Sequence, residues 1–363
     1  MKKSNLTILA NLYPTPEKPF FGTFVKNIYE GLNEDLFNKN KIVLPDFGAG
    51  IFGYIKFYFV ALFKLFNYDG IVFVHYVSHS VMPALIAKIF NSKIVLVLNY
   101  HGSDAFPESS ESRFKRILKF KICKSANKYS SLIVVPSKYF KCKIINGYNI
   151  SSEKIIVSPS GGYNKDIFNT HITNVDEQEI NSNKYLFAGR MIEGKGCILA
   201  AEAAIKLSEI DETATFRFVG SGPLENQVCK ILEPLIKQNK CVVKPSLSQL
   251  ELAEEFKKST FFLFPSMREG ESLGLVLVEA MACGSIPIAI NQGALEEILN
   301  GYATELTTNK ACYIDLVENS IKFDWKKRKI IRSHFLDSTK KYESKTVIDQ
   351  LSKKLFGLVN EEL

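Results

Sequence analysis

The chain has 363 residues, more than one hydrophobic core usually covers, so we expect two domains. Its 46% apolar and 23% charged residues are ordinary for a globular protein. Seven cysteines, never spaced as CxxC, argue against a disulfide framework or a zinc ribbon and favour a reducing compartment. No stretch reaches the roughly 20 apolar residues that span a bilayer. The N-terminal stretch reads as a strand rather than a signal peptide, because Asn11 and Pro14 end it early.

Charge is unevenly distributed along the chain. Residues 1–165 carry 22 Lys and Arg against 10 Asp and Glu, a net charge of +12. The remainder carries 24 against 28, a net charge of −4. A basic first half predicts an anionic partner, which would be either nucleic acid or a membrane surface.

Short strands rich in β-branched residues alternate with helical segments in the first half of the chain. They are expected at 6–12, 70–76, 93–100, 131–137 and 154–160. This alternation predicts parallel βαβ units, with functional residues in the loops that follow the carboxyl ends of the strands.

Two helical segments of the first half suggest contact with a membrane. Residues 51–66, IFGYIKFYFVALFKLF, are apolar and aromatic, so this helix is either buried or faces lipid. Residues 112–129, SRFKRILKFKICKSANKY, form a basic amphipathic helix that is either a solvated face or a docking surface for anionic lipid. No aromatic platform is interleaved with these cations as in nucleic-acid-binding motifs, so we expect no nucleic-acid partner.

His75 and His79 are four residues apart, a spacing that suits a metal pair on a helix. His75, however, falls in an expected strand, and no third ligand is evident in the sequence. We therefore predict no metal site.

The strand and helix pattern restarts after a polar stretch at 158–183, which we interpret as an inter-domain linker. The strands of the second half are expected at 184–190, 214–222, 240–246, 260–266 and 285–290. We predict an α/β protein with domains at 1–165 and 166–320, and a helical tail at 321–363 that can pack back on the first domain. The domains would be doubly wound, Rossmann-like and facing each other across a central cleft.

Residues 268–284, REGESLGLVLVEAMACG, place two carboxylates around one apolar helix. We expect this helix to begin near Ser272 and to stop at Gly284. Glu271 then flanks its N-terminus, and Glu279 lies eight residues on, about 12 Å along a helix axis. The first amides would suit a phosphate, ribose hydroxyls would satisfy Glu279 and sugar hydroxyls Glu271. The alternative makes Glu279 a structural partner of an Arg or Lys.

Two further motifs belong to the second half. AGRMIEGKG (188–196) supplies Arg190 and Lys195, which could grip a diphosphate or be ordinary surface cations. FVGSGPLENQV (218–228) approaches the dinucleotide pattern GxGxxG, but Glu225 occupies the third glycine position. We read it as a tight turn between strand and helix, and we expect no cofactor.

These motifs together resemble a known family. GRMIEGKG, VGSGPLE, FPSMREGESLGLVLVEAMACGSIPIA and QGALEE, in this order and spacing, are similar to the C-terminal half of retaining GT-B glycosyltransferases of family 4. The family signature Glu-x7-Glu is matched by Glu271 and Glu279. In the first half, PFFGTFVKNIYEGL (19–32) resembles the family's glycine-containing loop, and NYHGSDAF (99–106) resembles its His-Gly-Ser-Asp motif.

The resemblance implies roles for individual residues. In the second half it assigns Glu279 to the donor ribose, Glu271 to the donor sugar, Arg190 and Lys195 to the diphosphate, and the amides of Ser272, Leu273, Gly274 and Leu275 to phosphate or sugar oxygens.

In the first half the resemblance places His101 at the donor sugar near the anomeric centre, with Asp104 close by, and Gly22 where backbone approaches the ligand. From the residues alone, Gly22 could equally begin a helix and His101 could be structural. The segment VVKPSLSQ (242–249) lacks the glycine common where the family lines the base, which leaves the base open between UDP and GDP.

The expected protein is a cytoplasmic retaining glycosyltransferase, peripheral on the inner face of the cell membrane. It would move a hexose or N-acetylhexosamine from a nucleotide diphosphate-sugar, with UDP-sugar as the expected donor. The acceptor would be a lipid-linked saccharide in surface-polysaccharide biosynthesis, such as lipopolysaccharide O-antigen or capsule. A sugar-nucleotide epimerase of similar shape is the alternative enzyme. A non-catalytic binding module is a further alternative, against which the intact set of Arg190, Lys195, Glu271 and Glu279 argues.

Overall fold

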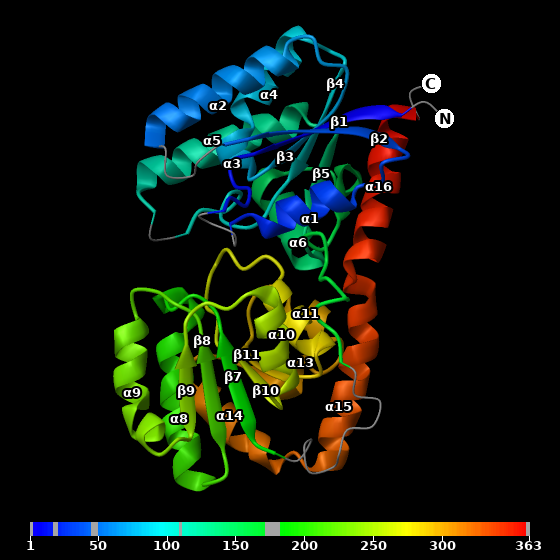
Figure 1. Ribbon diagram of the computed structural model, residues 1–363. Helices are drawn as coiled ribbons and strands as arrows, with labels where there is room; N and C mark the ends of the chain where they lie inside the picture. The colour runs from blue at the N-terminus through cyan, green and yellow to red at the C-terminus, as the bar shows by residue number, and fades with distance from the viewer. Residues whose placement is uncertain (1–2, 17–20, 45–49, 109–110, 171–181, 361–363) are drawn as a thin grey trace. The chain divides into compact units, whose positions relative to one another are not determined.

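A computed structural model describes residues 3–16, 21–44, 50–108, 111–170 and 182–360 (Figure 1). The chain divides into two compact units, which we call unit one and unit two. Unit one comprises Met1–Gly162 together with Ser344–Leu363, and unit two comprises Tyr163–Glu343. Residues 171–181 of the predicted linker lie outside the described residues.

Unit one contains a parallel sheet whose strands follow the order β2-β1-β3-β4-β5-β6. Its elements are β1 (Ser4–Ala10), α1 (Thr23–Gly31), β2 (Phe37–Val43), α2 (Gly50–Leu65), β3 (Gly70–His75), α3 (Val77–Ser80), α4 (Met82–Phe90), β4 (Ile94–Asn99), α5 (Arg113–Tyr129), β5 (Leu132–Val135), α6 (Lys138–Tyr148), the 3₁₀ helix η1 (Ser152–Lys154), β6 (Ile155–Val157) and α16 (Ser344–Asn360).

Alternate strand residues of this sheet bury side chains on its two faces, as the period of two in a strand requires. One face packs against α2, α4, α5 and α6, and the other against α1 and α16. The five strands predicted in this half are present. The strand β2 was missed, because FNKNKIV is too polar to stand out from a helical or loop segment. It can be this polar because it lies at the edge of the sheet, where it pairs only with β1.

The helix α2 is not the buried helix that one interpretation of residues 51–66 required. Only Phe57, Ala61 and Leu65 are buried along it, while Phe52 and Phe63 are 81% and 87% exposed. None of the described helices combines the length and apolar character needed to cross a membrane.

Unit two contains a second parallel sheet, with the order β12-β11-β10-β7-β8-β9. Its elements are β7 (Lys184–Ala188), η2 (Glu193–Lys195), α8 (Cys197–Ile210), β8 (Thr215–Val219), α9 (Glu225–Lys237), β9 (Cys241–Lys244), α10 (Gln249–Lys257), β10 (Phe261–Phe264), α11 (Leu275–Ala282), β11 (Ile286–Ile290), α12 (Leu295–Leu299), α13 (Ala303–Leu306), β12 (Thr307–Thr308), α14 (Tyr313–Asn319), η3 (Ser320–Lys322), α15 (Trp325–Ser338) and η4 (Thr339–Tyr342). The prediction of two parallel α/β sheets is therefore confirmed.

The C-terminal residues divide between the two units. The helix α15 packs in unit two through Ile331 and Phe335 and through the buried guanidinium of Arg328, which donates hydrogen bonds to the carbonyl oxygens of Phe323 and Ser182. The helix α16 returns to unit one, where Ile348, Leu351 and Leu355 join the core beside α1.

Candidate active site

The apolar helix of residues 268–284 begins later than its sequence predicts. The helix α11 starts at Leu275, and its N-cap is Gly274, whose φ of 83° lies in the left-handed region, not Ser272. Ser has the better capping chemistry, but glycine reaches positive φ at least cost, so the backbone turn fixes the start. Residues 271–274 are thus not helical, and the spacing of 12 Å expected along a helix axis does not apply to them. The predicted end holds, since Gly284 follows the helix with a φ of 87°.

Glu271 lies in a compact polar cluster before this helix. Its Oε2 accepts hydrogen bonds from the Nζ of Lys195 at 2.6 Å and from the hydroxyl of Ser266 at 2.9 Å. Burial alone would raise the pKa of Glu271, but Lys195 and Ser266 outweigh it and hold the pKa below its usual value. The carboxylate therefore stays ionised and held in place.

The loop that carries Lys195 rests on the backbone that follows β10. Gly194 accepts a hydrogen bond from the amide of Met267 at 2.9 Å. Gly196 has a φ of 68°, and a Cβ there would overlap the carbonyl oxygen of Pro265. The second glycine of GKG is therefore required by close backbone contact, and the contacts of both glycines place Lys195 beside Glu271.

Glu279 lies in the second turn of α11 and is only 9% exposed. No hydrogen bond or ion pair of its carboxyl group is found among the described residues. Burial raises its pKa to about 7. The alternative in which Glu279 pairs with a structural Arg or Lys thus has no such partner in the part of the chain that the structure describes.

Arg190 follows β7 at the carboxyl edge of the sheet, with an exposed side chain. No side-chain contact joins it to the cluster of Lys195 and Glu271 among the described residues. The turn after β8 packs on this loop, because the amide of Met191 donates to the carbonyl oxygen of Ser221 at 3.0 Å. A Cβ on Gly220 would overlap the carbonyl oxygen of Gly189. GSG here is a tight turn that supports the loop of Arg190.

His101 follows β4 in unit one and is half-buried. Its Nε2 lies 3.1 Å from the Nδ1 of His75, which ends the neighbouring strand β3. The rings of Phe24 and Tyr76 lie against it, with centroids 4.5 and 4.7 Å away. Burial, with His75 adding to it, lowers the pKa of His101 well below its usual value, so the ring is neutral at physiological pH.

Asp104 closes the loop that carries His101. Its Oδ1 accepts hydrogen bonds from the amides of His101 and Gly102, and its Oδ2 accepts from the amide of Val77. The side chain is only 2% exposed, and burial raises its pKa to about 6 against the opposing effect of these amides. In this arrangement Asp104 sets the position of the His101 backbone.

Gly22 is the N-cap of α1, with a φ of 70°. A Cβ at this position would lie 2.6 Å from the carbonyl oxygen of Leu12, in the loop after β1. A glycine is therefore needed for the backbone to pass so close to that loop. Residues 19 and 20 of the predicted glycine-containing loop are outside the described residues.

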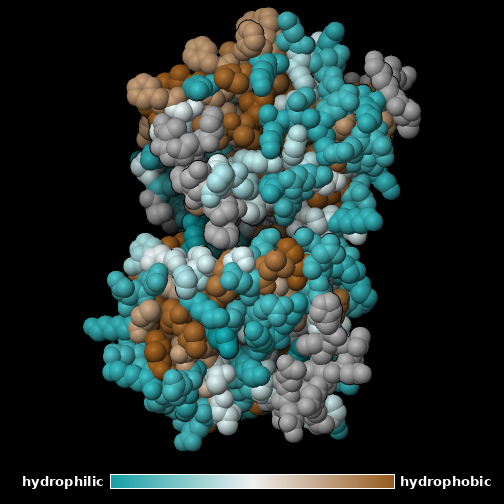
Figure 2. All heavy atoms as spheres, viewed as in Figure 1, coloured by the Kyte–Doolittle hydropathy of each residue, from teal (hydrophilic) through white to brown (hydrophobic). Residues whose placement is uncertain are grey.

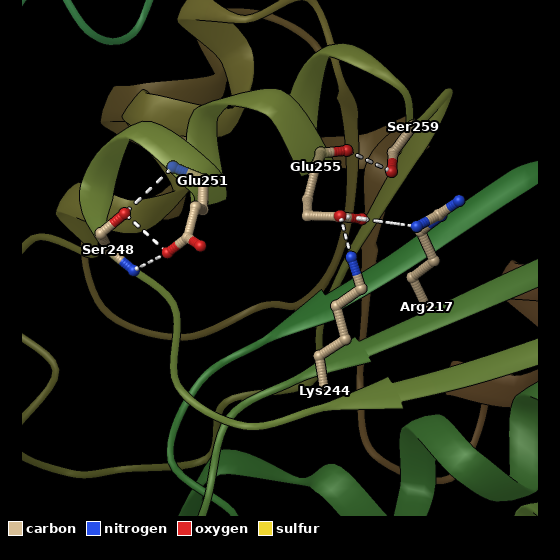
Figure 3. Close-up of polar contacts among 6 residues, drawn as sticks. All are labelled: Arg217, Lys244, Ser248, Glu251, Glu255 and Ser259. Atoms are coloured by element: carbon tan, nitrogen blue, oxygen red, sulfur yellow. Dashed lines mark hydrogen bonds and ion pairs between the residues drawn. The ribbon is translucent and has the colours of Figure 1, made fainter.

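A third polar cluster ties α10 to the strands beneath it (Figure 3). Glu255, almost fully buried, accepts from the Nζ of Lys244 at 2.7 Å and from the guanidinium of Arg217 at 3.0 Å. Ser248 caps α10 in a capping box with Glu251. These contacts hold both ends of VVKPSLSQ, the segment compared above with the family's base-lining segment.

Metal-ligating side chains do not gather in groups of three or more within the described part of the chain. His75 turns towards His101, and the Nδ1 of His79 lies 3.1 Å from the hydroxyl of Ser78. The two histidines therefore serve separate local contacts.

Sequence reasoning missed Ser266 and His75 as parts of these clusters. Ser266 carried a weak signal, since it follows a buried strand at the carboxyl edge of its sheet. His75 carried a stronger one, because parallel pairing of β3 with β4 sets it opposite Asn99, two residues before His101.

Two family models match the chain. "Glycosyltransferase Family 4" matches residues 32–161, and "Glycosyl transferases group 1" matches residues 172–323. An uncharacterised glycosyltransferase of Methanocaldococcus jannaschii is 28% identical, over 71% of this chain and 73% of that protein. The chain is a glycosyltransferase of the group 1 and family 4 type. This finding decides against the epimerase and the non-catalytic module.

Solved structures show the fold independently. Anabaena HepE in complex with UDP and glucose matches with a TM-score of 0.73 at 15% identity, covering 97% of this chain and 99% of that one. Sucrose-phosphate synthase of Thermosynechococcus elongatus matches with a TM-score of 0.74 at 15% identity, covering 99% and 100%. The glycosyltransferase therefore has the GT-B fold.

Proposed function

We propose that this glycosyltransferase is a retaining enzyme that moves a hexose or N-acetylhexosamine from a UDP-sugar to a lipid-linked saccharide in surface-polysaccharide biosynthesis. The proposal of a nucleotide-sugar donor rests on the burial of Glu279. A buried carboxyl group without a protein partner costs free energy, and nucleotide ribose offers two hydroxyl donors to satisfy it. The resemblance assigns this residue to the ribose, and its surroundings support that assignment.

The diphosphate is proposed to lie at the first turn of α11, near Lys195 and Arg190. The amides at Ser272, Leu273, Gly274 and Leu275 are the proposed donors to phosphate or sugar oxygens. Leu275 is the first residue of α11, whose first amides have no acceptor within the helix, and the other three precede it in the turn. The cations neutralise charge that builds on the leaving diphosphate. Glu271, held by Lys195 and Ser266, is the proposed acceptor for donor-sugar hydroxyls.

Transfer with retention is proposed without a covalent nucleophile. The acceptor hydroxyl attacks the anomeric carbon from the face that the diphosphate leaves, and the leaving phosphate oxygen takes the proton of the attacking hydroxyl. His101 is the proposed contact to the donor sugar near the anomeric centre, and Asp104 positions the loop that carries it.

Calorimetric titration of UDP and of GDP tests the donor site. We expect saturable binding of UDP by the wild type and binding at least about tenfold weaker by Glu279→Gln, equal to about 1.4 kcal/mol. Glu202→Gln, an exposed change on α8, is the matched control and should leave the affinity unchanged. Tight binding of GDP instead of UDP would overturn the base assignment, and unchanged UDP binding by Glu279→Gln would overturn the ribose role.

An exposed apolar surface on unit one supports the proposal of a lipid-linked acceptor. The helices α2 and α4 pack together, as do α4 and α5, and apolar side chains gather over this part of unit one (Figure 2, upper left). We call this set the apolar helix surface, and its large exposed side chains are Ile51, Phe52, Ile55, Phe59, Val60 and Phe63 on α2, Ile86, Ile89 and Phe90 on α4, and Phe114, Ile117, Leu118 and Phe120 on α5.

The occupant proposed for this surface is an anionic bilayer at the inner face of the cell membrane. Exposed aromatic side chains of this density are unusual on a monomer facing water. They lie beside a row of exposed cations on α5: Arg113, Lys115, Arg116, Lys121, Lys124 and Lys128. Apolar area together with positive charge is the combination that binds an amphipathic helix to anionic lipid.

Transfer assays test the acceptor. The enzyme is incubated with radiolabelled UDP-glucose or UDP-N-acetylglucosamine and with polyprenyl-linked or free saccharides. Label entering only the organic-soluble product supports the proposal, whereas label entering only water-soluble saccharide would sink the lipid-linked acceptor. An inverted anomeric configuration of the product would contradict retention.

A further inference from the structure

The roles proposed above leave His75 without a function. Its ring is fully buried at the end of β3 and stacks on that of His101, with centroids 5.3 Å apart and planes 13° apart. The Nδ1 of His75 lies 3.1 Å from the Nε2 of His101, a hydrogen-bonding distance. The two rings therefore share one proton between these nitrogens.

The direction of this hydrogen bond fixes the tautomer of both rings. Burial lowers the pKa of His75 to about 3, and that of His101 also lies well below its usual value, so both rings are neutral. A neutral imidazole carries one ring proton and leaves its other nitrogen as an acceptor. Either His75 donates from Nδ1, or His101 donates from Nε2.

The second nitrogen of His75 distinguishes the two arrangements. Its Nε2 is buried and finds no hydrogen-bond partner in the part of the chain that the structure describes. If His101 donated, this Nε2 would carry a buried N–H without an acceptor, which is rarer than a bare buried acceptor. The proton therefore lies on Nδ1 of His75 and is donated to His101. The side-chain nitrogen Nδ2 of Asn99 is placed 3.4 Å from the same Nδ1. Two donors cannot face each other, so a proton on Nδ1 requires the Asn99 amide to be turned with its oxygen towards the ring, where it accepts a share of that proton.

We propose that His75 is a positioning residue that holds His101 as the Nδ1–H tautomer, so that His101 meets the donor sugar as a hydrogen-bond donor. The functional half of this inference rests on the proposed contact between His101 and the sugar. An Nδ1–H group can stabilise charge that develops on a sugar or phosphate oxygen. It cannot remove the proton of the acceptor hydroxyl, so His101 would not be a general base.

The tautomer can be read directly in the wild-type protein without substrate. The chain has five histidines, so ring-¹⁵N-labelled protein gives a simple long-range ¹H–¹⁵N spectrum, with His101→Gln and His75→Asn assigning the two rings. We expect the Nδ1 of both rings to carry the proton and both Nε2 to be bare. A protonated Nε2 on His101 would overturn the proposal.

Two substitutions test the consequence for activity. His75→Asn keeps an amide donor close to the position of Nδ1, whereas His75→Phe removes it. In His75→Phe we expect His101 to shift towards the Nε2–H tautomer and kcat to fall about tenfold, as for one lost hydrogen bond. His75→Asn should restore both, and UDP affinity should change in neither variant.

A purely structural His75 predicts a different outcome, in which the tautomer of His101 stays the same in both variants. If His75→Phe does not fold, as judged by its circular dichroism, the wild-type spectrum and the activity and spectrum of His75→Asn still test the proposal. Failure of the proposed function is separable as well. A protein that transfers no sugar but shows the expected spectrum would sink the transferase reaction and leave the tautomer standing.

Discussion

The Nζ of Lys195 lies 2.6 Å from Oε2 of Glu271, although 76 residues separate them in the sequence. Their side chains are 16% and 18% exposed, so water screens the pair less than it screens a surface ion pair. The pair joins the loop after β7 to the segment before α11, and these are the two places where the donor phosphates and sugar are proposed to bind. The site is thus held together before any ligand arrives.

Lys195→Met should destabilise unit two by about 2 kcal/mol, between the values for surface and buried pairs, because it removes the ion pair of a largely buried carboxylate and leaves it the hydrogen bond from Ser266. The chain's one tryptophan, Trp325, lies in unit two, so its fluorescence in urea reports this unfolding. The double variant Lys195→Met/Glu271→Gln should recover most of the loss. The pair Glu233–Lys237 is 2.7 Å apart but exposed, so water screens it and the same cycle there should give little or no coupling. Equal coupling in the two cycles would contradict the role of burial.

The coupling between Lys195 and Glu271 should depend on pH in a defined direction. The pKa of Glu271 is lowered in the folded protein, so its stabilisation is complete above the unfolded-state pKa and disappears as the pH falls through the folded value. The double-mutant cycle repeated at neutral pH and at acidic pH should show the coupling only at neutral pH. A coupling that grows on acidification would be inconsistent with an ionised Glu271.

The strands of both sheets follow from sequence because buried parallel strands are continuous runs of β-branched and aromatic residues. The residue pairs that form the candidate site do not follow from the sequence in this way. The sequence spacing of Lys195 and Glu271 does not predict their contact. The contact results from the backbone packing of Gly196 against Pro265. The start of α11 also escaped prediction, because Ser272 has cap chemistry while the decisive feature is the positive φ of Gly274. Burial of Glu279 was predictable from its apolar neighbours, whereas only coordinates could show that no described residue pairs with its carboxyl group.

Glu279→Gln should change the pH dependence of stability. Burial raises the folded-state pKa of Glu279 to about 7, so between its unfolded value and pH 7 the folded protein binds the proton more tightly and loses stability as the pH rises. The loss is about 3 kcal/mol at 1.36 kcal/mol per pKa unit. The unfolding free energy of Glu279→Gln, relative to wild type, should therefore rise by this amount from pH 4.5 to pH 7.5. A difference that is constant with pH would refute the raised pKa.

Nucleotide binding should release a proton from Glu279. Ribose hydroxyls donate to the ionised carboxylate and so lower its pKa. Near pH 6 the free enzyme carries this proton and binding expels it, whereas near pH 8.5 the group is already ionised. Calorimetry of UDP binding in buffers of different ionisation enthalpy measures the proton count. Subtracting the count for Glu279→Gln removes the nucleotide's own phosphate ionisation. An equal count for wild type and variant at pH 6 would exclude an ionised Glu279 in the complex.

Gly196→Ala should damage both stability and donor binding. Alanine at a φ of 68° costs about 1 kcal/mol from backbone strain, and its Cβ would overlap the carbonyl oxygen of Pro265. Gly301→Ala is the matched control in unit two, since Gly301 also has a positive φ but open space around its Cβ position. We expect a loss above about 2 kcal/mol for the first and about 1 kcal/mol for the second, measured by Trp325 fluorescence. UDP affinity should fall only for Gly196→Ala, because Lys195 is its neighbour, and equal effects of the two substitutions would argue against the backbone contact.

Charge reversal tests whether the cations of α5 beside the apolar helix surface bind anionic lipid, as proposed. Lys121→Glu/Lys124→Glu changes two exposed cations of α5, whereas Lys353→Glu/Lys354→Glu changes two exposed cations of α16 and alters the net charge equally. We expect the wild type to pellet with vesicles of phosphatidylcholine and phosphatidylglycerol. The α5 variant should lose binding by about tenfold or more, at about 1 kcal/mol for each charge removed and a further penalty for each carboxylate gained. The α16 variant should bind like wild type, and equal losses would show only a dependence on net charge.

Apolar insertion predicts a second, salt-resistant part of the binding. Phe59 and Phe63 are 71% and 87% exposed on α2, so Phe59→Ser/Phe63→Ser removes side chains that make little contact with the core and should leave unfolding nearly unchanged. Each buried aromatic side chain contributes about 1.5–3 kcal/mol on leaving water, so the pair should weaken vesicle binding by more than about tenfold. The loss should persist at high salt, where the contribution of Lys121 and Lys124 is screened. Wild-type pelleting by the serine variant would mean that α2 does not enter the bilayer and that any binding is electrostatic.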